Sequence, residues 1–444
     1  MSNASNLAPG VTSGDSHVYV HNRQTGQTLC VSVAPDGSQG NAWSDTPAIS
    51  GNGQFVAFDS VASNLVPGVT SGVRQVYVRD CTAGKTTLVS VGSGGGEGNG
   101  VSLNSTITAD GRYVAFNSAA TDLVPGVTNG KSQVYVYDTH ATNMVCASLG
   151  HDGSQGDSDS YIAYISADGS CVAFISRAGN LVTGIPGGQD LIYVRDLRAG
   201  TNSCVSLAPN GNPANAPCNA SSISADGRFV GFDSRAANLV AGVANGYDNC
   251  FVRDRQSGTT ALVSVASGGA LGNADSDSPQ LSADGRLVVF ESDASNLVSG
   301  DTNQQTDVFL RDLQAGQTTR VSVSASGGQL NDFSWVGLSS ISSSGTVIAF
   351  HTDARNVVPG MTDFPGDVYV RDLGSVTNAG ALAIAGNASR LTVSWPAALV
   401  ATLQTNSSLA STNWTAYGGT VISLGGTNTV TLAPTTSKLF FRLH

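Results

Sequence analysis

The chain has 444 residues, 53 of them glycine, and only 12% of its residues are charged. Its formal net charge is −11, which argues against nucleic acid or an anionic membrane surface as a partner. The sequence contains no run of about 18 apolar residues, so it predicts no insertion into a membrane. Of the 32 acidic residues only Glu97 and Glu291 are glutamate, and this excess of aspartate favours turns and strands over helices.

The start of the chain does not resemble a signal peptide. Between Met1 and Ser5 there is no basic residue followed by an apolar stretch. Either the protein stays inside the cell or its start lies upstream of this sequence. The first short apolar runs, Val18 to Val20 and Leu29 to Val33, are predicted strands that match the later half of a repeating unit.

A repeat of 58 residues organises most of the chain. Each unit carries four short runs rich in Val, Ile, Phe and Tyr, and four strands in a unit of this length are typical of a propeller blade. In one unit these runs, called a, b, c and d, are Thr106 to Thr108, Tyr113 to Asn117, Val134 to Tyr137 and Val145 to Leu149. The glycines of the turn between a and b recur at steps of 58, 58, 58, 58 and 60 residues, at Gly53, Gly111, Gly169, Gly227, Gly285 and Gly345. The sequence therefore predicts an all-β fold, a β-propeller of four-stranded blades.

The repeat also resembles a known family. The segment from Ile223 to Phe232, with its Ser-Ala-Asp-Gly turn, is followed by the strand Val252-Arg253-Asp254. This arrangement is similar to the WD40-like (PD40) repeat of TolB-type propellers. The resemblance covers roughly residues 5 to 373 and implies the fold, but it implies little about function because such repeats occur in scaffolds, lyases and peptidase gates.

The number of blades depends on how the ends of the repeat region meet. The chain enters at c and d of its first unit, and the last unit provides only a, b and c, at Ile341, Val347 to Phe350 and Val368 to Val370. Six blades result if the first d strand completes the last a-b-c set, which leaves the first c strand over. Seven blades result if an a-b pair precedes the first c strand. The sequence favours six, and seven stays possible.

The connections between strands are unequal, and this indicates which end of the propeller binds a ligand. The a-b and c-d turns are short, whereas the d-a and b-c connections are long and polar. Because long loops on a rigid scaffold usually carry binding sites, the long-loop end is the candidate ligand-binding face. The acidic residues predicted to contribute to it are Asp157, Asp159, Asp275, Asp277 and Asp332.

One loop of this face is a candidate calcium site. Asp301, Asn303 and Asp307 offer oxygen ligands at the spacing that a hard cation uses. An EF-hand loop would also carry a glycine at its sixth position and a distal acid, and this loop has neither. Calcium is thus a possible cofactor, and the alternative is that these side chains cap turns.

Signals of catalysis are weak. The six histidines are scattered over different repeats, and no Gly-x-Ser-x-Gly nucleophile motif occurs. The leading hypothesis is therefore a non-catalytic binding or scaffold protein that uses the long-loop face to recognise a glycan or a protein. The alternative is a polysaccharide-active, lyase-like enzyme with a site at the axial mouth, where His17, His151 or His351 would meet an acid.

The composition changes after Asp372. Residues 1–373 are predicted to form the propeller, 374–386 a linker and 387–444 a small β-sandwich. The segments Val393-Ser394-Trp395-Pro396 and Phe440-Phe441-Arg442-Leu443 resemble the module that ends many secreted proteins of Verrucomicrobia-like bacteria. This resemblance implies an extracellular or cell-envelope location.

Overall fold

The computed structural model describes residues 1–12, 14–337, 340–358 and 366–374, and strand segments between 383 and 443. The chain divides into two compact units, Met1–Asp372 and Leu373–His444. Every regular element in the described parts is a strand. Among the described residues, no helix is long and apolar enough to cross a membrane.

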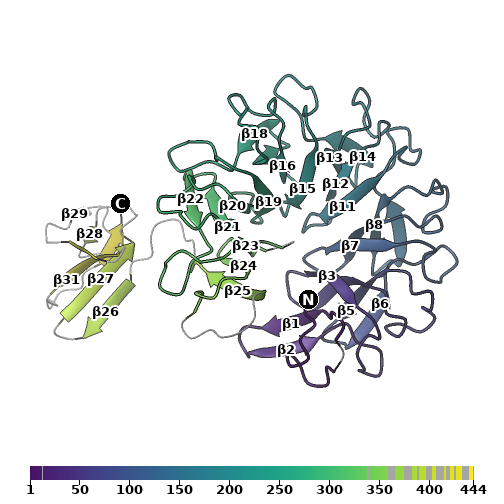
Figure 1. Cartoon of the computed structure of the whole chain (residues 1–444), viewed down its shortest axis with the longest axis horizontal. Helices are drawn as coiled ribbons and strands as arrows, with labels where there is room; N and C mark the ends of the chain where they lie inside the picture. Colours follow the sequence, from purple (N-terminus) through teal and green to yellow (C-terminus); the bar gives the residue numbers. More distant parts are fainter. Residues whose placement is uncertain are drawn as a thin grey trace. The chain divides into compact units, whose positions relative to one another are not determined.

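The first unit is a six-bladed β-propeller, as the sequence predicts (Figure 1). The blades follow one another round a central opening, and in each blade the antiparallel strands run in the order a, b, c, d. Five blades have four strands and the sixth has three. The strands of the first three blades are β3 (Ser44–Ile49), β4 (Phe55–Ser60), β5 (Gln75–Asp80), β6 (Lys85–Leu88), β7 (Ser102–Ile107), β8 (Tyr113–Ser118), β9 (Gln133–Asp138), β10 (Asn143–Cys146), β11 (Ser160–Ile165), β12 (Cys171–Ser176), β13 (Leu191–Asp196) and β14 (Thr201–Cys204). Those of the last three are β15 (Cys218–Ile223), β16 (Phe229–Ser234), β17 (Asn249–Asp254), β18 (Thr259–Leu262), β19 (Ser276–Leu281), β20 (Leu287–Ser292), β21 (Asp307–Asp312), β22 (Gln317–Arg320), β23 (Ser334–Trp335), β24 (Val347–Thr352) and β25 (Asp367–Asp372).

The N-terminal strands form a separate two-stranded sheet. β1 (Tyr19–Asn22) pairs with β2 (Gln27–Cys30) in antiparallel register. The expectation that this d strand completes the sixth blade is wrong, because β2 pairs with β1 and β25 pairs with β24. Figure 1 shows β1 and β2 after β25 and before the β3–β6 blade round the ring.

The core lies between blades. In strands b and c of one blade an aromatic pair stacks, such as Phe116 on Tyr135 with ring centroids 5.9 Å apart. This pair packs on Val76 and Val78 in strand c of the preceding blade and on Val89 after its d strand. The same stacked pair recurs at Phe58–Tyr77, Phe174–Tyr193, Phe232–Phe251 and Phe290–Phe309. Blades therefore stabilise one another through alternating apolar residues of their central strands.

A bulge near the start of strand a recurs in several blades and interrupts its pairing with strand b. The register of β3 against β4 shifts between Asp45 and Ala48. The bulge places a non-glycine residue in the left-handed region, with φ of 40° at Thr46. Equivalent residues with positive φ are Asn104, Ile162 and Ser278.

The second unit contains two antiparallel sheets, with strand orders β26-β27-β31-β30 and β29-β28-β32. A sandwich of these sheets, and the bounds of linker and module, stay predictions. The strands are β26 (Ala383–Asn387), β27 (Arg390–Pro396), β28 (Leu403–Asn406), β29 (Thr415–Ala416), β30 (Ile422–Leu424), β31 (Thr427–Leu432) and β32 (Phe440–Leu443).

The a-b turn glycines provide a test of the packing between blades. Gly111 has φ of 76°, and a Cβ added there would clash with the ring of Phe55 in the preceding blade. Gly53 has a similar φ of 72°, but a Cβ there would meet nothing within 4 Å. We expect Gly53→Ala to lower the free energy of unfolding by about 1–2 kcal/mol, which is the strain of a non-glycine residue at positive φ. Gly111→Ala should lower it by about 1–3 kcal/mol more, because its Cβ also overpacks the contact with Phe55. Equal losses in denaturant unfolding of the two variants would contradict this account.

Candidate functional site

Three positions of each blade lie near the long-loop ends of strands a, b and c, and we call them the mouth positions. They are the second residue of strand a, the fifth residue of strand b and the residue before strand c. While the core positions repeat almost unchanged, the mouth positions differ in chemistry from blade to blade. In blade order they are Asp45, Asp59 and Arg74; Leu103, Asn117 and Ser132; Tyr161, Ile175 and Asp190; Asn219, Asp233 and Asp248; Asp277, Glu291 and Thr306; and Trp335, His351 and Gly366.

In the first blade these positions form a compensated charge cluster. Asp45 and Asp59 lie directly opposite each other on β3 and β4. Arg74 ion-pairs with both carboxylates, at 3.3 Å from Asp45 and closer to Asp59. Its guanidinium also lies over the ring of Trp43, 4.6 Å from the centroid. Two carboxylates and an aromatic face thus hold one cation.

The fifth blade has the same carboxylate pair without the cation. Asp277 and Glu291 lie opposite each other on β19 and β20, and Thr306 stands where the first blade has Arg74. Within the described residues no basic side chain forms an ion pair with Asp277 or Glu291. These residues line a hollow of about 310 Å³, together with Ser292, Asp293, Thr306, Phe333 and Trp335.

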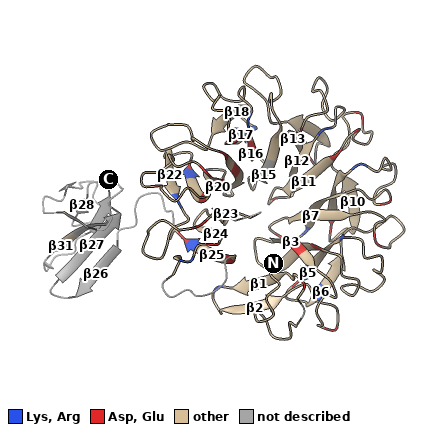
Figure 2. Cartoon of the chain, in the orientation of Figure 1, with Lys and Arg blue, Asp and Glu red and all other residues tan. Residues whose placement is uncertain are grey.

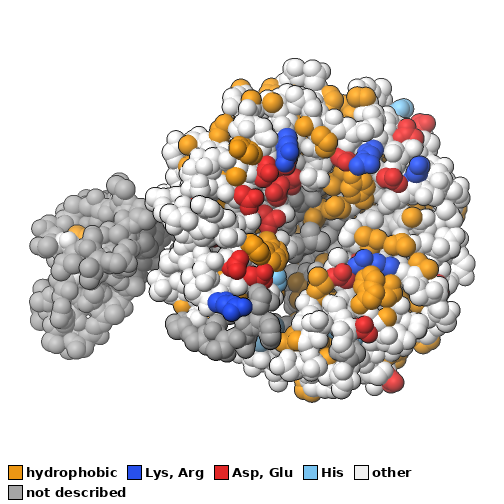
Figure 3. Space-filling view, in the orientation of Figure 1, with side chains coloured by type: hydrophobic (Ala, Val, Ile, Leu, Met, Phe, Trp, Pro, Cys, Tyr) orange, Lys and Arg blue, Asp and Glu red, His pale blue; other side chains and the backbone are white. Residues whose placement is uncertain are grey.

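The wall of the hollow comes from the sixth blade and is aromatic. The rings of Phe333 and Trp335 are tilted against each other with centroids 5.7 Å apart, and the centroid of Trp335 lies 4.3 Å from that of His351. Phe333 takes the place that Trp43 has in the first blade, because each precedes the first residue of strand a. Charged residues are sparse over the whole ring (Figure 2), yet acidic side chains gather beside hydrophobic ones at one side of the opening (Figure 3).

Burial and mutual repulsion raise the pKa values of these carboxyl groups. Burial, followed by the charges of Asp248, Glu291, Asp275 and Asp293, raises the pKa of Asp277 to about 6. The pKa of Glu291 is also raised, mainly by burial, although Ser278 and the Val336 amide donate hydrogen bonds to it. In the neighbouring blade, burial raises the pKa of Asp233 to about 7. The hollow is therefore a place where a cation would be stabilised and where, below about pH 6, the protonated form of Asp277 is favoured.

The structure brings Asp275 and Asp277 to the fifth blade, places Asp332 next to Phe333 at the wall of the hollow, and leaves Asp157 and Asp159 before β11. Asp275 accepts a hydrogen bond from the Asp248 amide and lies 3.3 Å from Arg235, close to Asp277. The other three bond to the backbone: Asp157 accepts from the Gly179 amide at 2.8 Å, Asp159 from the Ser132 amide at 2.9 Å, and Asp332 from the Phe333 amide at 3.0 Å. The sequence analysis did not identify Glu291, Phe333 and Trp335. An alignment of the repeats could have pointed to this blade, because it shows Thr306 at the position of Arg74.

The candidate calcium ligands lie around an arginine. Arg320 is 3.4 Å from the Asp301 carboxylate and 3.0 Å from that of Asp307. Asp307 also accepts hydrogen bonds from Ser322 and Asn303. It stands where other blades have a buried glutamine that accepts from the equivalent serine, as Gln75 does from Ser90. Calcium binding here stays a prediction, and the ion would compete with the Arg320 guanidinium for the same oxygens.

The histidines named for a lyase-like site occupy different surroundings. His17 is buried and bonds through Nδ1 to Ser32 at 3.2 Å. His151 lies in an exposed turn, and His351 packs on Trp335. The part of the chain that the structure describes contains no group of three or more His, Cys, Asp or Glu placed to hold a metal.

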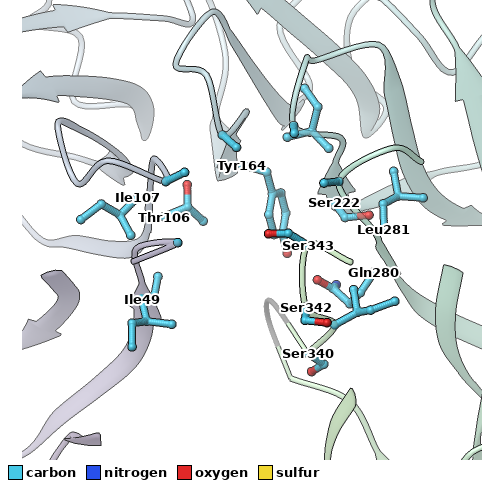
Figure 4. Close-up of a pocket in the computed structure, with 18 of the residues that line it drawn as sticks. Ile49, Thr106, Ile107, Tyr164, Ser222, Gln280, Leu281, Ser340, Ser342 and Ser343 are labelled. Atoms are coloured by element: carbon cyan, nitrogen blue, oxygen red, sulfur yellow. The ribbon is translucent and has the colours of Figure 1, made fainter. Parts of the chain in front are cut away.

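The short-turn end of the opening is lined by small and apolar side chains. Its hollow of about 420 Å³ includes Ile49, Ile107, Tyr164 and Leu281, with the hydroxyl groups of Thr106 and several serines between them (Figure 4). No described residue that lines this hollow is charged.

None of the protein-family models matches the sequence, and none of the curated proteins matches it. Among solved structures, TolB from Acinetobacter baumannii is 17% identical with a TM-score of 0.39, over 68% of this chain and 59% of that protein. A putative TolB from Agrobacterium tumefaciens is 17% identical with a TM-score of 0.43, over 81% of this chain and 98% of that protein. An acylaminoacyl peptidase from Pyrococcus horikoshii is 11% identical with a TM-score of 0.45, and this chain covers 53% of its length.

TolB is also the family whose repeat the sequence resembles. At these identities and TM-scores the likenesses carry no argument about function. The fold itself is established by the chain's own strands and their pairing.

The raised pKa values predict an unusual dependence of stability on pH. Because folded Asp277 binds its proton more tightly than the unfolded chain does, its contribution to stability is lost as pH rises from about 4 to about 6. After allowance for partial exposure, we expect Asp277→Asn to raise the free energy of unfolding at pH 8 by about 1–2 kcal/mol and to change little at pH 4. Asp157→Asn removes the same charge from the same face and is the control. A stabilisation by Asp277→Asn that is the same at both pH values would count against the charge repulsion.

Proposed function

We propose that this chain is a non-catalytic binding protein that uses the long-loop face of its propeller to recognise a protein partner, through a basic side chain that enters the hollow beside Asp277 and Glu291. The observation that carries the proposal is the exchange of Arg74 for Thr306 between two equivalent carboxylate pairs. In the first blade the protein's own guanidinium fills the place. In the fifth blade Thr306 stands at that place, and the carboxylate pair lines a hollow of about 310 Å³, which has room for a basic side chain.

The surroundings of the pair favour a guanidinium or an ammonium group. Phe333 and Trp335 offer aromatic surface next to the carboxylates, and a cation that touches both gains charge-assisted hydrogen bonds and a cation–π contact. Binding of a cation would lower the pKa of Asp277, so protons would be released on binding near pH 6.

Glycan recognition is the second candidate. Phe333 is one of the few large apolar side chains that are well exposed, and it stands beside carboxylates that can accept hydrogen bonds from sugar hydroxyl groups. A neutral sugar would not require the charges, and this separates the two candidates by experiment. We do not propose the polysaccharide-active enzyme, because His17, His151 and His351 occupy different surroundings. An extracellular or cell-envelope location is part of the proposal and rests on the resemblance of the C-terminal segments.

Thr306→Arg tests the proposal by supplying the missing cation from within. We expect the variant to melt at a higher temperature at pH 8, because the new guanidinium would pair with Asp277 and Glu291 as Arg74 pairs in the first blade. We also expect it to abolish binding of an arginine-containing peptide in calorimetric titration, and Asp277→Asn to weaken that binding about tenfold, or 1.4 kcal/mol.

A peptide with citrulline in place of arginine is the matched ligand, and Asp157→Asn is the matched variant. Equal binding of the arginine and citrulline peptides, or binding that survives Thr306→Arg, would rule out recognition of a basic side chain. Binding of neutral oligosaccharides that depends on Trp335 and not on Asp277 would transfer the function to the glycan candidate.

Calcium binding at Asp301, Asn303 and Asp307 is tested by removing the competing charge. We expect Arg320→Gln to lower the melting temperature in EDTA, since it leaves buried Asp307 without its ion pair, and calcium to restore part of the loss. Calcium should shift the unmodified chain less than the variant. If calcium shifts neither, these three residues do not form a calcium site.

A further inference from the structure

The sixth blade exposes two valines whose equivalents are buried in the complete blades. Val368 of β25 is 67% exposed and Val370 is 46% exposed. Their equivalents Val76 and Val78 in β5 are buried against Phe116, which belongs to strand b of the next blade. The face of β25 therefore has the composition of a surface that a following blade covers.

The β1–β2 sheet stands at the following position and has the outer half of a blade. Val18 and Val31 pack on Phe58 of the next blade, as the equivalent residues of complete blades do. Arg23, after β1, forms an ion pair with Asp372 at the end of β25, with 3.1 Å between Nη2 and Oδ2. Strands c and d of an additional blade are thus in place, next to the exposed valines.

Ser2 stands where strand b of this additional blade would end. It precedes His17 by the same distance along the chain as Ser60 precedes Gln75. Ser2 and His17 exchange both backbone hydrogen bonds, at 3.0 and 2.9 Å, and Ser60 pairs with Gln75 in the same register. The Ser2–His17 bridge is therefore the last rung of a b-c ladder.

The short-turn end of the ring shows the same gap between β25 and the β3–β6 blade. Backbone hydrogen bonds join successive a-b turns, from the Gly51 amide to the Ala109 carbonyl at 3.0 Å and onward to Ala283 and Ser343 at 3.0 Å. Within the described residues no backbone hydrogen bond joins the Ser343 turn to the Gly51 turn. Gly53 is consistent with this gap. A Cβ added to Gly53 would meet nothing within 4 Å, whereas a Cβ added to each of the other a-b glycines would meet a side chain of the preceding blade.

We propose that the position between β25 and β1 is a docking site for a β-hairpin with the a-b sequence of this repeat, whose second strand runs into Ser2. The aromatic residue two places before Ser2 would stack on Tyr19, as Phe58 stacks on Tyr77, and cover Val368 and Val370. The a-b turn of the hairpin would lie between the Ser343 and Gly51 turns and would complete the series of backbone hydrogen bonds between a-b turns. The occupied ring would hold seven blades, and the site is independent of the hollow at Asp277.

The test extends the full chain with its own repeat. Residues 102–117 are copied in front of Ser2 in place of Met1, so that Ser2 follows the copy as Ser118 follows Asn117. We expect the melting temperature to rise by on the order of 5 °C. We also expect a thiol introduced by Val368→Cys to react at least tenfold more slowly in the extended chain, measured at that peptide by mass spectrometry.

Two controls distinguish docking from an inert extension. The same extension with Phe116→Asp in the copied segment should give neither effect, because the hairpin would lose its buried aromatic ring. Gly53→Ala should become as damaging in the extended chain as Gly111→Ala, since the copied Tyr113 would now lie against it.

The proposal is overturned if the extension changes neither the melting temperature nor the labelling. It is also overturned if the unextended chain is a dimer by light scattering in which residue 368 is protected, because the site would then belong to a second copy. Neither outcome depends on whether a peptide binds in the hollow beside Asp277 and Glu291.

Discussion

The packing of each blade's aromatic pair against the valines of the blade before it is the interaction on which this structure depends. A blade has two apolar faces and cannot bury either within its own sheet, so each is stable only between neighbours. Phe116 and Tyr135, for instance, are fully buried only because Val76 and Val78 lie against them. This requirement keeps the repeat length and the core residues nearly constant from blade to blade.

The same constraint leaves the mouth positions free to vary. They lie toward the long-loop ends of the strands, and the six blades carry acids, amides, a tyrosine, a tryptophan and an arginine there. Variation confined to one ring of a repetitive scaffold separates the residues that recognise a ligand from those that maintain the fold. Carboxylates occupy these positions in the first, third, fourth and fifth blades, and the pair of the fifth blade lies beside the aromatic residues of the sixth.

Much of the propeller could be predicted because each period of the repeat corresponds to one blade. Strand b was predicted at Tyr113 to Asn117 and is observed at Tyr113–Ser118. Strand a was predicted to begin at Thr106 but begins at Ser102, because the bulge at Asn104 interrupts the alternation of apolar and polar residues. The hollow could be predicted only in part. Asp277 was named, but its aromatic wall comes from the next blade, and proximity across blades leaves no pattern in a single repeat. The pairing of β2 likewise depends on the geometry of the ring and not on strand composition.

Two carboxylates opposite each other on neighbouring strands destabilise a sheet unless a cation lies between them. The first blade meets this cost internally with Arg74, and the fifth blade does not. An arginine at position 306 would be compatible with the repeat, since Arg74 occupies the same place without disturbing the blade. A local charge conflict that the chain resolves in one blade and retains in another is the pattern expected at a functional site, where stability is lower because the ligand completes the interaction. Burial and the neighbouring acidic charges raise the pKa of Asp277 to about 6, so protonation relieves the same charge conflict at lower pH.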